Sequence, residues 1–252
     1  MALGPDSRFS LRTQPMTRAE AEAAGIDVGL REYMLKVYNY MTSGLLLTGI
    51  VAYIAANTPA ILNALYAQGP QGLQPTLLAW IVMLSPLAFV FALSFGINRM
   101  QASTAQAVFW GFAAVMGLSL AHILLAFTGA SVARVFFITA GTFAAMSLYG
   151  YTTKRDLTGI GSFLFMGLIG IILASLVNLF LQSSGLHFVI SIIGVGVFVG
   201  LTAFDTQKIK SMYAETDHGE VHHKKAIMGA LTLYLDFINL FLMLLRLIGD
   251  RR

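Results

Sequence analysis

Long apolar runs separated by short polar connections make up most of the chain after residue 32. Each run reaches about 20 residues, the length that an α-helix needs to cross ~30 Å of hydrocarbon. We therefore expect an all-α, polytopic membrane protein. The runs predict seven membrane-spanning helices, at residues 33–57, 77–98, 104–128, 132–152, 160–182, 187–209 and 226–248.

Two features interrupt this pattern. The connection from Thr58 to Thr76 is the single long linker on the outer side, and it contains three prolines and no charged side chain. Pro86 lies inside the second span, where it frees a backbone carbonyl from the helix. Membrane bundles tolerate such a proline because neighbouring groups bind the freed carbonyl.

The segment before the first span is polar. It carries several charges and no central apolar stretch, so it does not resemble a cleaved secretory signal. We expect two parts of the chain: a cytoplasmic N-terminal tail at residues 1–30 and a seven-helix transmembrane domain at residues 31–252.

The composition agrees with a membrane protein and narrows its chemistry. Hydrophobic residues make up 57% of the chain and charged residues 11%, against about 25% in soluble proteins. There is no cysteine, which excludes disulfides and thiol catalysis. No phosphate-binding loop, nucleophile elbow or zincin motif is present, so an enzyme has no support from the sequence.

The basic residues predict the orientation. Of the 16 Lys and Arg residues, 12 lie in the N-terminal region or in connections on the same side of the predicted bundle. Cytoplasmic segments hold such an excess, so we expect a cytoplasmic N-terminus that faces anionic lipid rather than nucleic acid. Seven crossings place Arg246, Arg251 and Arg252 outside, against this rule. A shallow or re-entrant last segment is the alternative, but seven crossings are favoured.

Asp236 is the residue that most needs an explanation, because it lies near the middle of the last apolar run. A carboxylate at bilayer depth costs roughly 2.5 to 3.5 kcal/mol, so it marks a functional site unless a partner neutralises it. Asn239, one turn later, shares its helix face. Asp236 is predicted to titrate or to contact an ion; the alternative is a protonated side chain that binds a neighbouring helix.

Asp205 is the second candidate, near the end of the preceding apolar run. If the two aspartates meet, they can share one proton or bind one cation. That contact requires a tilt or a later start of the last helix. Alternatively, Asp205 pairs with nearby lysines at the interface. Arg99, after the second span, is a candidate latch on the aspartates, or else its side chain extends to water.

The histidines offer a weaker hypothesis. His218, His222 and His223, with Glu220, have spacings that could form a surface metal site, but a solvated cytoplasmic loop accounts for them and is the favoured interpretation. His122 and His187, at the spans, are expected to be hydrogen-bonded or interfacial rather than metal ligands.

Three stretches together resemble the bacterial branch of the Bax inhibitor-1 (TMBIM) family: residues 150–157 (GYTTKRDL), 204–210 (FDTQKIK) and 233–241 (LYLDFINLF). The resemblance implies a bundle whose last helix is central and surrounded by the other six, in the bacterial inner membrane. It also implies a pH-sensitive calcium leak with an aspartate-pair sensor, which motif matching places on Asp205 and Asp236. Arg99 occupies the place of the family's linked arginine.

The predicted function is therefore a pH-sensitive leak channel or transporter for calcium or a similar cation. The aspartate pair would be its gate and its transient calcium site, with no cofactor and no catalysis. Two alternatives remain. One is a non-transport regulator that binds a membrane-anchored quality-control protease, with which some bacterial relatives are associated. The other is a proton-coupled secondary transporter, although the sequence shows no repeat.

Overall fold

A computed structural model describes the protein over residues 27–69, 72–217 and 219–252. Within these residues, seven helices are long and apolar enough to cross a membrane, which confirms the predicted spans and the all-α class. Most of the predicted tail lies outside the described residues, but its last residues, 28–30, already belong to the first helix. The spans are α2 (Val28–Asn57), α4 (Leu77–Gly96), α5 (Ala102–Ala126), α6 (Gly129–Thr152), α7 (Thr158–Leu181), α8 (Ser184–Ser211) and α9 (Glu220–Ile248).

Several helices begin where a side chain caps them. The side-chain oxygens of Asp27, Thr76, Thr128 and Ser183 each accept a hydrogen bond from the backbone N–H three residues later. Such a bond satisfies one of the N–H groups that the first turn leaves free. These caps fix the starts of α2, α4, α6 and α8.

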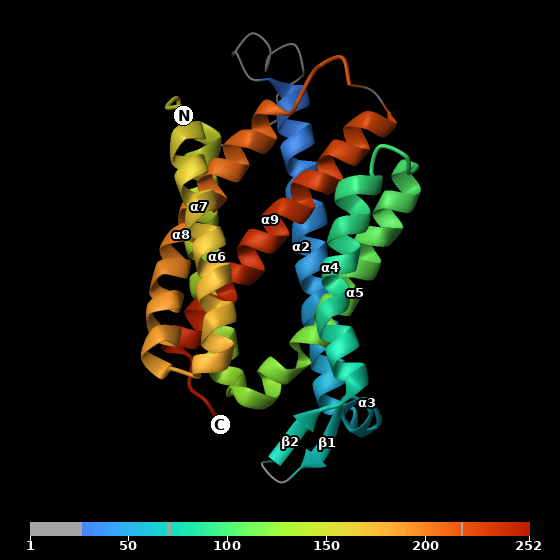
Figure 1. The fold of residues 1–252 in the computed structure, drawn as a ribbon. Helices are drawn as coiled ribbons and strands as arrows, with labels where there is room; N and C mark the ends of the chain where they lie inside the picture. The colour runs from blue at the N-terminus through green and yellow to red at the C-terminus, as the bar shows by residue number, and fades with distance from the viewer. Residues whose placement is uncertain (1–26, 70–71, 218) are drawn as a thin grey trace, which may run out of the picture.

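The helices form two groups of three with α9 between them (Figure 1). In one group α2 and α4 pack against α5, and in the other α6 and α7 pack against α8. Helix α9 runs obliquely across the middle and packs against α2, α5, α6 and α8. The last helix is therefore central, as predicted. It is not in close contact with all six others, because α4 and α7 lie at the periphery.

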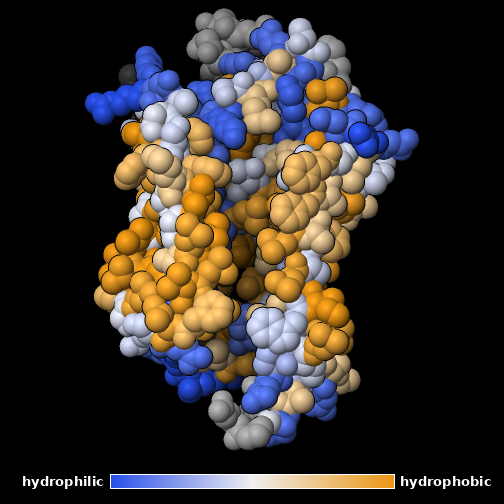
Figure 2. All heavy atoms as spheres, in the orientation of Figure 1, coloured by the Kyte–Doolittle hydropathy of each residue, from blue (hydrophilic) through white to orange (hydrophobic). Residues whose placement is uncertain are grey.

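Burial follows the same arrangement. In the most apolar window of α9, 67% of the residues are buried, against 11% in α7. The exposed side chains of the outer helices are mostly large and apolar, and they cover the middle of the face seen in Figure 2. Acyl chains cover such a surface, since a membrane span exposes its apolar residues to lipid.

Helix α6 approaches α8 closely at Gly150. A Cβ atom at this position would lie 2.1 Å from the backbone oxygen of Ala203. Only glycine fits here, and small residues at helix crossings are typical of membrane bundles. The contact brings the ends of α6 and α8 together.

Pro86 interrupts the hydrogen bonding of α4, as the sequence predicts, and the freed carbonyl has new partners. The backbone oxygen of Val82, four residues earlier, accepts hydrogen bonds from the hydroxyls of Ser119 on α5 (2.7 Å) and Ser85 (2.9 Å). A neighbouring helix thus replaces the donor that the proline lacks.

The long linker has regular structure of its own. It contains the short helix α3 (Pro59–Leu65) and the strands β1 (Tyr66–Gly69) and β2 (Gly72–Pro75), which pair antiparallel. The Thr76 hydroxyl donates to the carbonyl of Ala64 at 2.9 Å and so ties the end of the hairpin to α3. The hairpin lies at the end of the bundle opposite to the start of α2 (Figure 1).

The C-terminal residues lie at that same end, so α9 crosses the bundle completely (Figure 1). The structure does not show the shallow or re-entrant alternative. The tail is held by backbone bonds from Thr128 to Asp250 and from Arg252 to Ala126, each 3.0 Å. Arg134 forms an ion pair with Asp250 at 2.8 Å, which offsets part of the positive charge at this end.

Gly150→Ala is expected to lower stability by about 1 to 3 kcal/mol, because the new methyl group overlaps the backbone of α8. Gly141→Ala is the matched control, since Gly141 is on the same helix and a methyl group added there would have no atom within 4 Å. Thermal unfolding in one detergent measures both. A Gly150→Ala variant as stable as the control would contradict the close packing of α6 on α8.

Candidate functional site

The structure brings Asp205 and Asp236 together. Their carboxyl groups, on α8 and α9, lie close enough to interact directly. The Asp236 side chain is buried, with 5% of its surface exposed, whereas Asp205 is half-buried near the end of its helix. The contact does not arise from a later start of α9, which begins at Glu220, before the predicted residue 226. It arises from the oblique course of α9 (Figure 1).

A hydrogen bond between two carboxyl groups needs a proton. An ionised carboxylate only accepts, so at least one of the two aspartates must be protonated for such a bond to form. No N–H or hydroxyl group of the described residues donates to the buried Oδ2 atom of Asp236. The Asp236 Oδ2 atom is therefore buried without a partner among these residues. Two carboxyl groups this close influence each other's protonation, since two negative charges would repel.

Two lysines follow Asp205 in the sequence, but within the described residues neither forms an ion pair with it. Lys208 acts electrostatically on the Asp205 carboxyl, and its Nζ atom lies 6.0 Å from the centre of the Phe204 ring. Lys210 turns away and donates to the backbone oxygen of Tyr151 at 2.8 Å. No ion pair joins Asp205 to either lysine among the described residues. The interfacial ion pair considered as an alternative for Asp205 is therefore absent.

Arg99 does not reach the aspartates. Its side chain is exposed in the turn after α4, and over the described part of the chain it has no ion pair with Asp205 or Asp236. The expected latch is therefore not formed in this structure. The reason lies in the fold: α4 packs on α5 at the periphery, whereas the aspartates lie where α8 meets α9.

Asn239 shares the face of Asp236 but is bonded within its own helix. Its Nδ2 atom donates to the backbone oxygen of Leu235 at 2.8 Å. One N–H of the amide is thus bonded without a second helix. Asn239 contributes polarity to this face of α9 rather than a direct contact with the pair.

The first two family-like stretches bind each other. The Gln207 side chain on α8 accepts from the Leu157 N–H (2.9 Å) and donates to the Arg155 carbonyl (2.8 Å). Asp156, in the same connection, accepts from the N–H and the hydroxyl of Thr158. These bonds hold the pKa of the Asp156 carboxyl below its usual range. The connection between α6 and α7 is therefore fixed to the end of α8 that carries Asp205.

Tyr234, in the third stretch, joins α9 to the other helix group. Its hydroxyl lies 2.6 Å from the hydroxyl of Thr48 on α2, which in turn donates to the carbonyl of Ala113 on α5 (2.8 Å). Since the single hydroxyl proton of Thr48 goes to Ala113, Tyr234 is the donor to Thr48. Sequence reasoning missed this contact, although a tyrosine two residues before Asp236 was a usable signal.

A chain of hydroxyls lies beside Asp205 in sequence. Thr206 donates to the carbonyl of Thr202 (2.7 Å), so its oxygen accepts from Ser147 on α6 (2.9 Å). Ser147 in turn accepts from Tyr38 on α2 (2.7 Å). No sequence signal pointed to this chain, because single Ser and Thr residues are common in membrane spans. It links α2, α6 and α8 next to the aspartate pair.

The histidines show no metal geometry in the described structure. His122 bonds the backbone oxygen of Ser119 at 2.7 Å, as expected of a hydrogen-bonded histidine. His222 packs its ring against Tyr33, and His218 lies outside the described residues. No group of three or more acidic or histidine side chains is placed to hold a metal ion in the part of the chain that the structure describes.

Seven apolar spans, a buried central helix and an internal carboxyl pair define a polytopic, all-α membrane protein. The comparison with known families then identifies its group. Residues 30–252 match the family described as "Inhibitor of apoptosis-promoting Bax1", so the chain belongs to the Bax inhibitor-1 family.

Related proteins occur in several bacteria. The chain is 53% identical over 226 residues to an uncharacterized protein of Rickettsia prowazekii, a match that covers 90% of this chain and 92% of the relative. It is 51% identical over 226 residues to the inner membrane protein YbhL of Escherichia coli, covering 89% and 94%. A protein of Caulobacter vibrioides is 42% identical over 248 residues and covers 98% of both chains.

Gln207→Ala is expected to lower stability by about 1 kcal/mol, since it removes two hydrogen bonds at a site that water can partly replace. The freed connection should also be cut faster by trypsin at Lys154 and Arg155. Gln101→Ala is the control, because Gln101 is exposed near the same end and its side chain makes no capping bond. Equal trypsin rates for the two variants would contradict the clamping role of Gln207.

Proposed function

We propose that this protein is a pH-sensitive leak pathway for calcium or a similar cation, with Asp205 and Asp236 as its gate and proton sensor. The observation that carries the proposal is the meeting of two carboxyl groups from neighbouring spans inside the bundle. Charged groups at such a depth are rare, and they mark ion or proton pathways. Catalysis is no part of the proposal.

The chemistry of the pair suits a cation. Carboxylate oxygens are the hard ligands that calcium prefers, and calcium takes about six to eight of them. Two aspartates supply only part of that number, so the ion would bind transiently and keep water as it passes. Protons and cations compete for the same oxygens, which couples cation flux to pH.

Hydrogen bonds near the pair connect it to helices that do not carry an aspartate. The chain from Tyr38 through Ser147 to Thr206 joins α2 and α6 to the residue next to Asp205. When both carboxyl groups are ionised, two negative charges face each other and repel. That repulsion acts on α8 and α9, and through the hydroxyl chain on α2 and α6.

For location, we propose the bacterial inner membrane with a cytoplasmic N-terminus. The related YbhL protein is named as an inner membrane protein. The basic residues at the connections on the side of the α2 start, Arg99, Lys154, Arg155, Lys208 and Lys210, favour this side as cytoplasmic.

Replacing both aspartates with asparagine tests the sensor. Asparagine keeps the size of the side chain and its capacity for hydrogen bonds, but it cannot ionise. In liposomes, calcium flux through the wild type should change across a pH series, and flux through the Asp205→Asn/Asp236→Asn variant should be flat across the same series. Glu215→Gln, an exposed loop change, is the control and should respond as the wild type does.

A double variant with the wild-type flux and pH response would end the sensor hypothesis. Purified wild-type protein without flux at any pH would end the leak hypothesis and favour a regulator, which should co-purify with a membrane-anchored protease. Uptake that follows a proton gradient and saturates with one solute would indicate a secondary transporter.

Arg99→Gln is expected to leave both the calcium flux and its pH response unchanged, because the side chain contacts neither aspartate. The same liposome assay measures this variant. A loss of pH response in Arg99→Gln would show that the arginine reaches the pair in another conformation, as the family pattern implies.

A further inference from the structure

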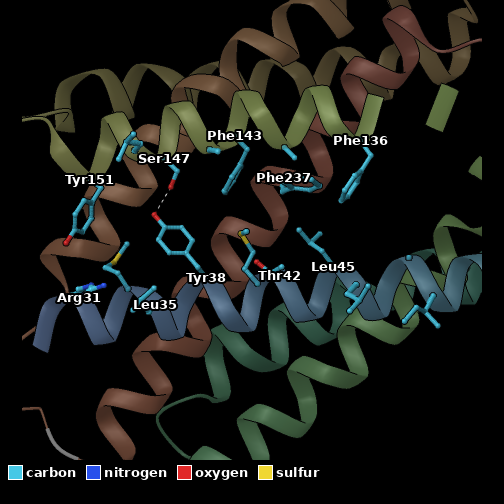
Figure 3. A pocket seen from close by; sticks show the side chains of 18 of the residues that line it. Arg31, Leu35, Tyr38, Thr42, Leu45, Phe136, Phe143, Ser147, Tyr151 and Phe237 are labelled. Atoms are coloured by element: carbon cyan, nitrogen blue, oxygen red, sulfur yellow. Dashed lines mark hydrogen bonds between the residues drawn. The ribbon is translucent and has the colours of Figure 1, made fainter. Parts of the chain in front are cut away.

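A long groove separates α2 from α6 on one side of the bundle (Figure 3). Helix α2 packs against α5 and α9, and α6 packs against α8 and α9, so the two helices form opposite walls. Phe237 of α9 lies between them. The groove has a volume of about 1160 Å³, above the ~300 to 1,000 Å³ that is usual for pockets of drug-sized ligands.

The groove lies at membrane depth and opens toward the acyl chains. Its lining on α2 runs from Arg31 to Ile54, which is roughly 35 Å along a helix and matches the ~30 Å of bilayer hydrocarbon. Leu46 and Ile54 in this lining are exposed. The walls are almost entirely apolar, and the hydroxyls of Tyr38 and Ser147 bond each other across the groove.

One end of the groove carries a positive charge. Arg31 is the charged residue of the lining, and it lies near the start of α2, before the apolar part of that span. Its side chain is exposed and has no ion pair or side-chain hydrogen bond within the described ranges. Tyr151 projects from α6 across the same end toward the start of α2 (Figure 3).

We propose that the α2–α6 groove is a phospholipid site. One acyl chain lies between the helices over Phe237, and the phosphate of the headgroup pairs with the Arg31 guanidinium. This proposal does not rest on the calcium leak.

The charge and the shape favour a lipid over other occupants. Apolar walls offer water few hydrogen bonds, so water is a poor occupant. A long apolar groove with one cationic end is complementary to an acyl chain that carries an anionic headgroup. Arginine binds phosphate through two parallel hydrogen bonds, which a guanidinium at the rim can supply. Contact with surrounding lipid alone gives no preference for one position, so the headgroup pairing supplies the selectivity.

The probe is phosphatidylglycerol with a photoreactive group in one acyl chain, added to the full-length protein in detergent. After illumination, mass spectrometry maps the labelled residues, and native mass spectrometry counts the bound lipids. We expect labels on the groove walls and on the segment around Phe237, with one lipid retained. Labels spread evenly over the exposed faces of α4 and α7 would overturn the proposal.

Matched variants locate the site. Ala144→Trp fills the groove and should abolish groove labelling, whereas Ala145→Trp, next to it on α6 but outside the lining, should not. Arg31→Gln should reduce retained lipid about fivefold, the factor for one arginine beside an anionic lipid. Lys154→Gln, exposed at the same end, is its control and should retain lipid as the wild type does.

A second pair keeps the test decisive if Ala144→Trp does not fold. Gly49→Leu adds bulk from the opposite wall, and Gly141→Leu adds it outside the lining; at either glycine an added Cβ atom would have no atom within 4 Å. Equal labelling in the filled and control variants would overturn the proposal. So would a dimer that disappears when the groove is filled, since the occupant would then be a second copy of this chain.

Discussion

The central constraint of this structure is the removal of α9 from lipid. Because helices from both groups cover it, α9 can carry Asp236 at a depth where a lipid-facing carboxylate would be expelled. The three stretches typical of the family meet around this helix. Gln207 joins the first to the second, and the aspartate pair joins the second to the third. Of these links, the carboxyl pair is the one whose charge depends on protonation.

Much of the fold could be predicted from the hydrophobic pattern. The seven spans agree with the helices to within a few residues at most ends, because their apolar length is set by the bilayer. The larger differences lie at polar ends, where α2 and α9 begin before their apolar runs. The hairpin in the linker was not predicted, since strand pairing depends on contacts that a short polar segment does not reveal.

The candidate residues of the site could be named from the sequence, but their arrangement in space could not. A carboxylate inside an apolar run stands out, so Asp236 and Asp205 were found from the sequence. Whether they meet depends on the tilt of α9, and the hydrophobic periodicity of the sequence does not predict helix tilt. The separation of Arg99 from the aspartates in this structure was not predictable for the same reason, because distance along the chain does not show to which helix group its turn belongs. The hydroxyl chain that begins at Tyr38 consists of ordinary residues and becomes visible only in three dimensions.

The bond from Ser119 to Val82 has a consequence for motion. It fixes the axial register of α4 on α5, since sliding one helix by a single turn would separate the donor and acceptor by about 5.4 Å and leave a carbonyl bare in hydrocarbon. Helices α4 and α5 should therefore behave as one rigid pair. Any rearrangement of the bundle would then take place at the other helix contacts, and α4 and α5 would move together.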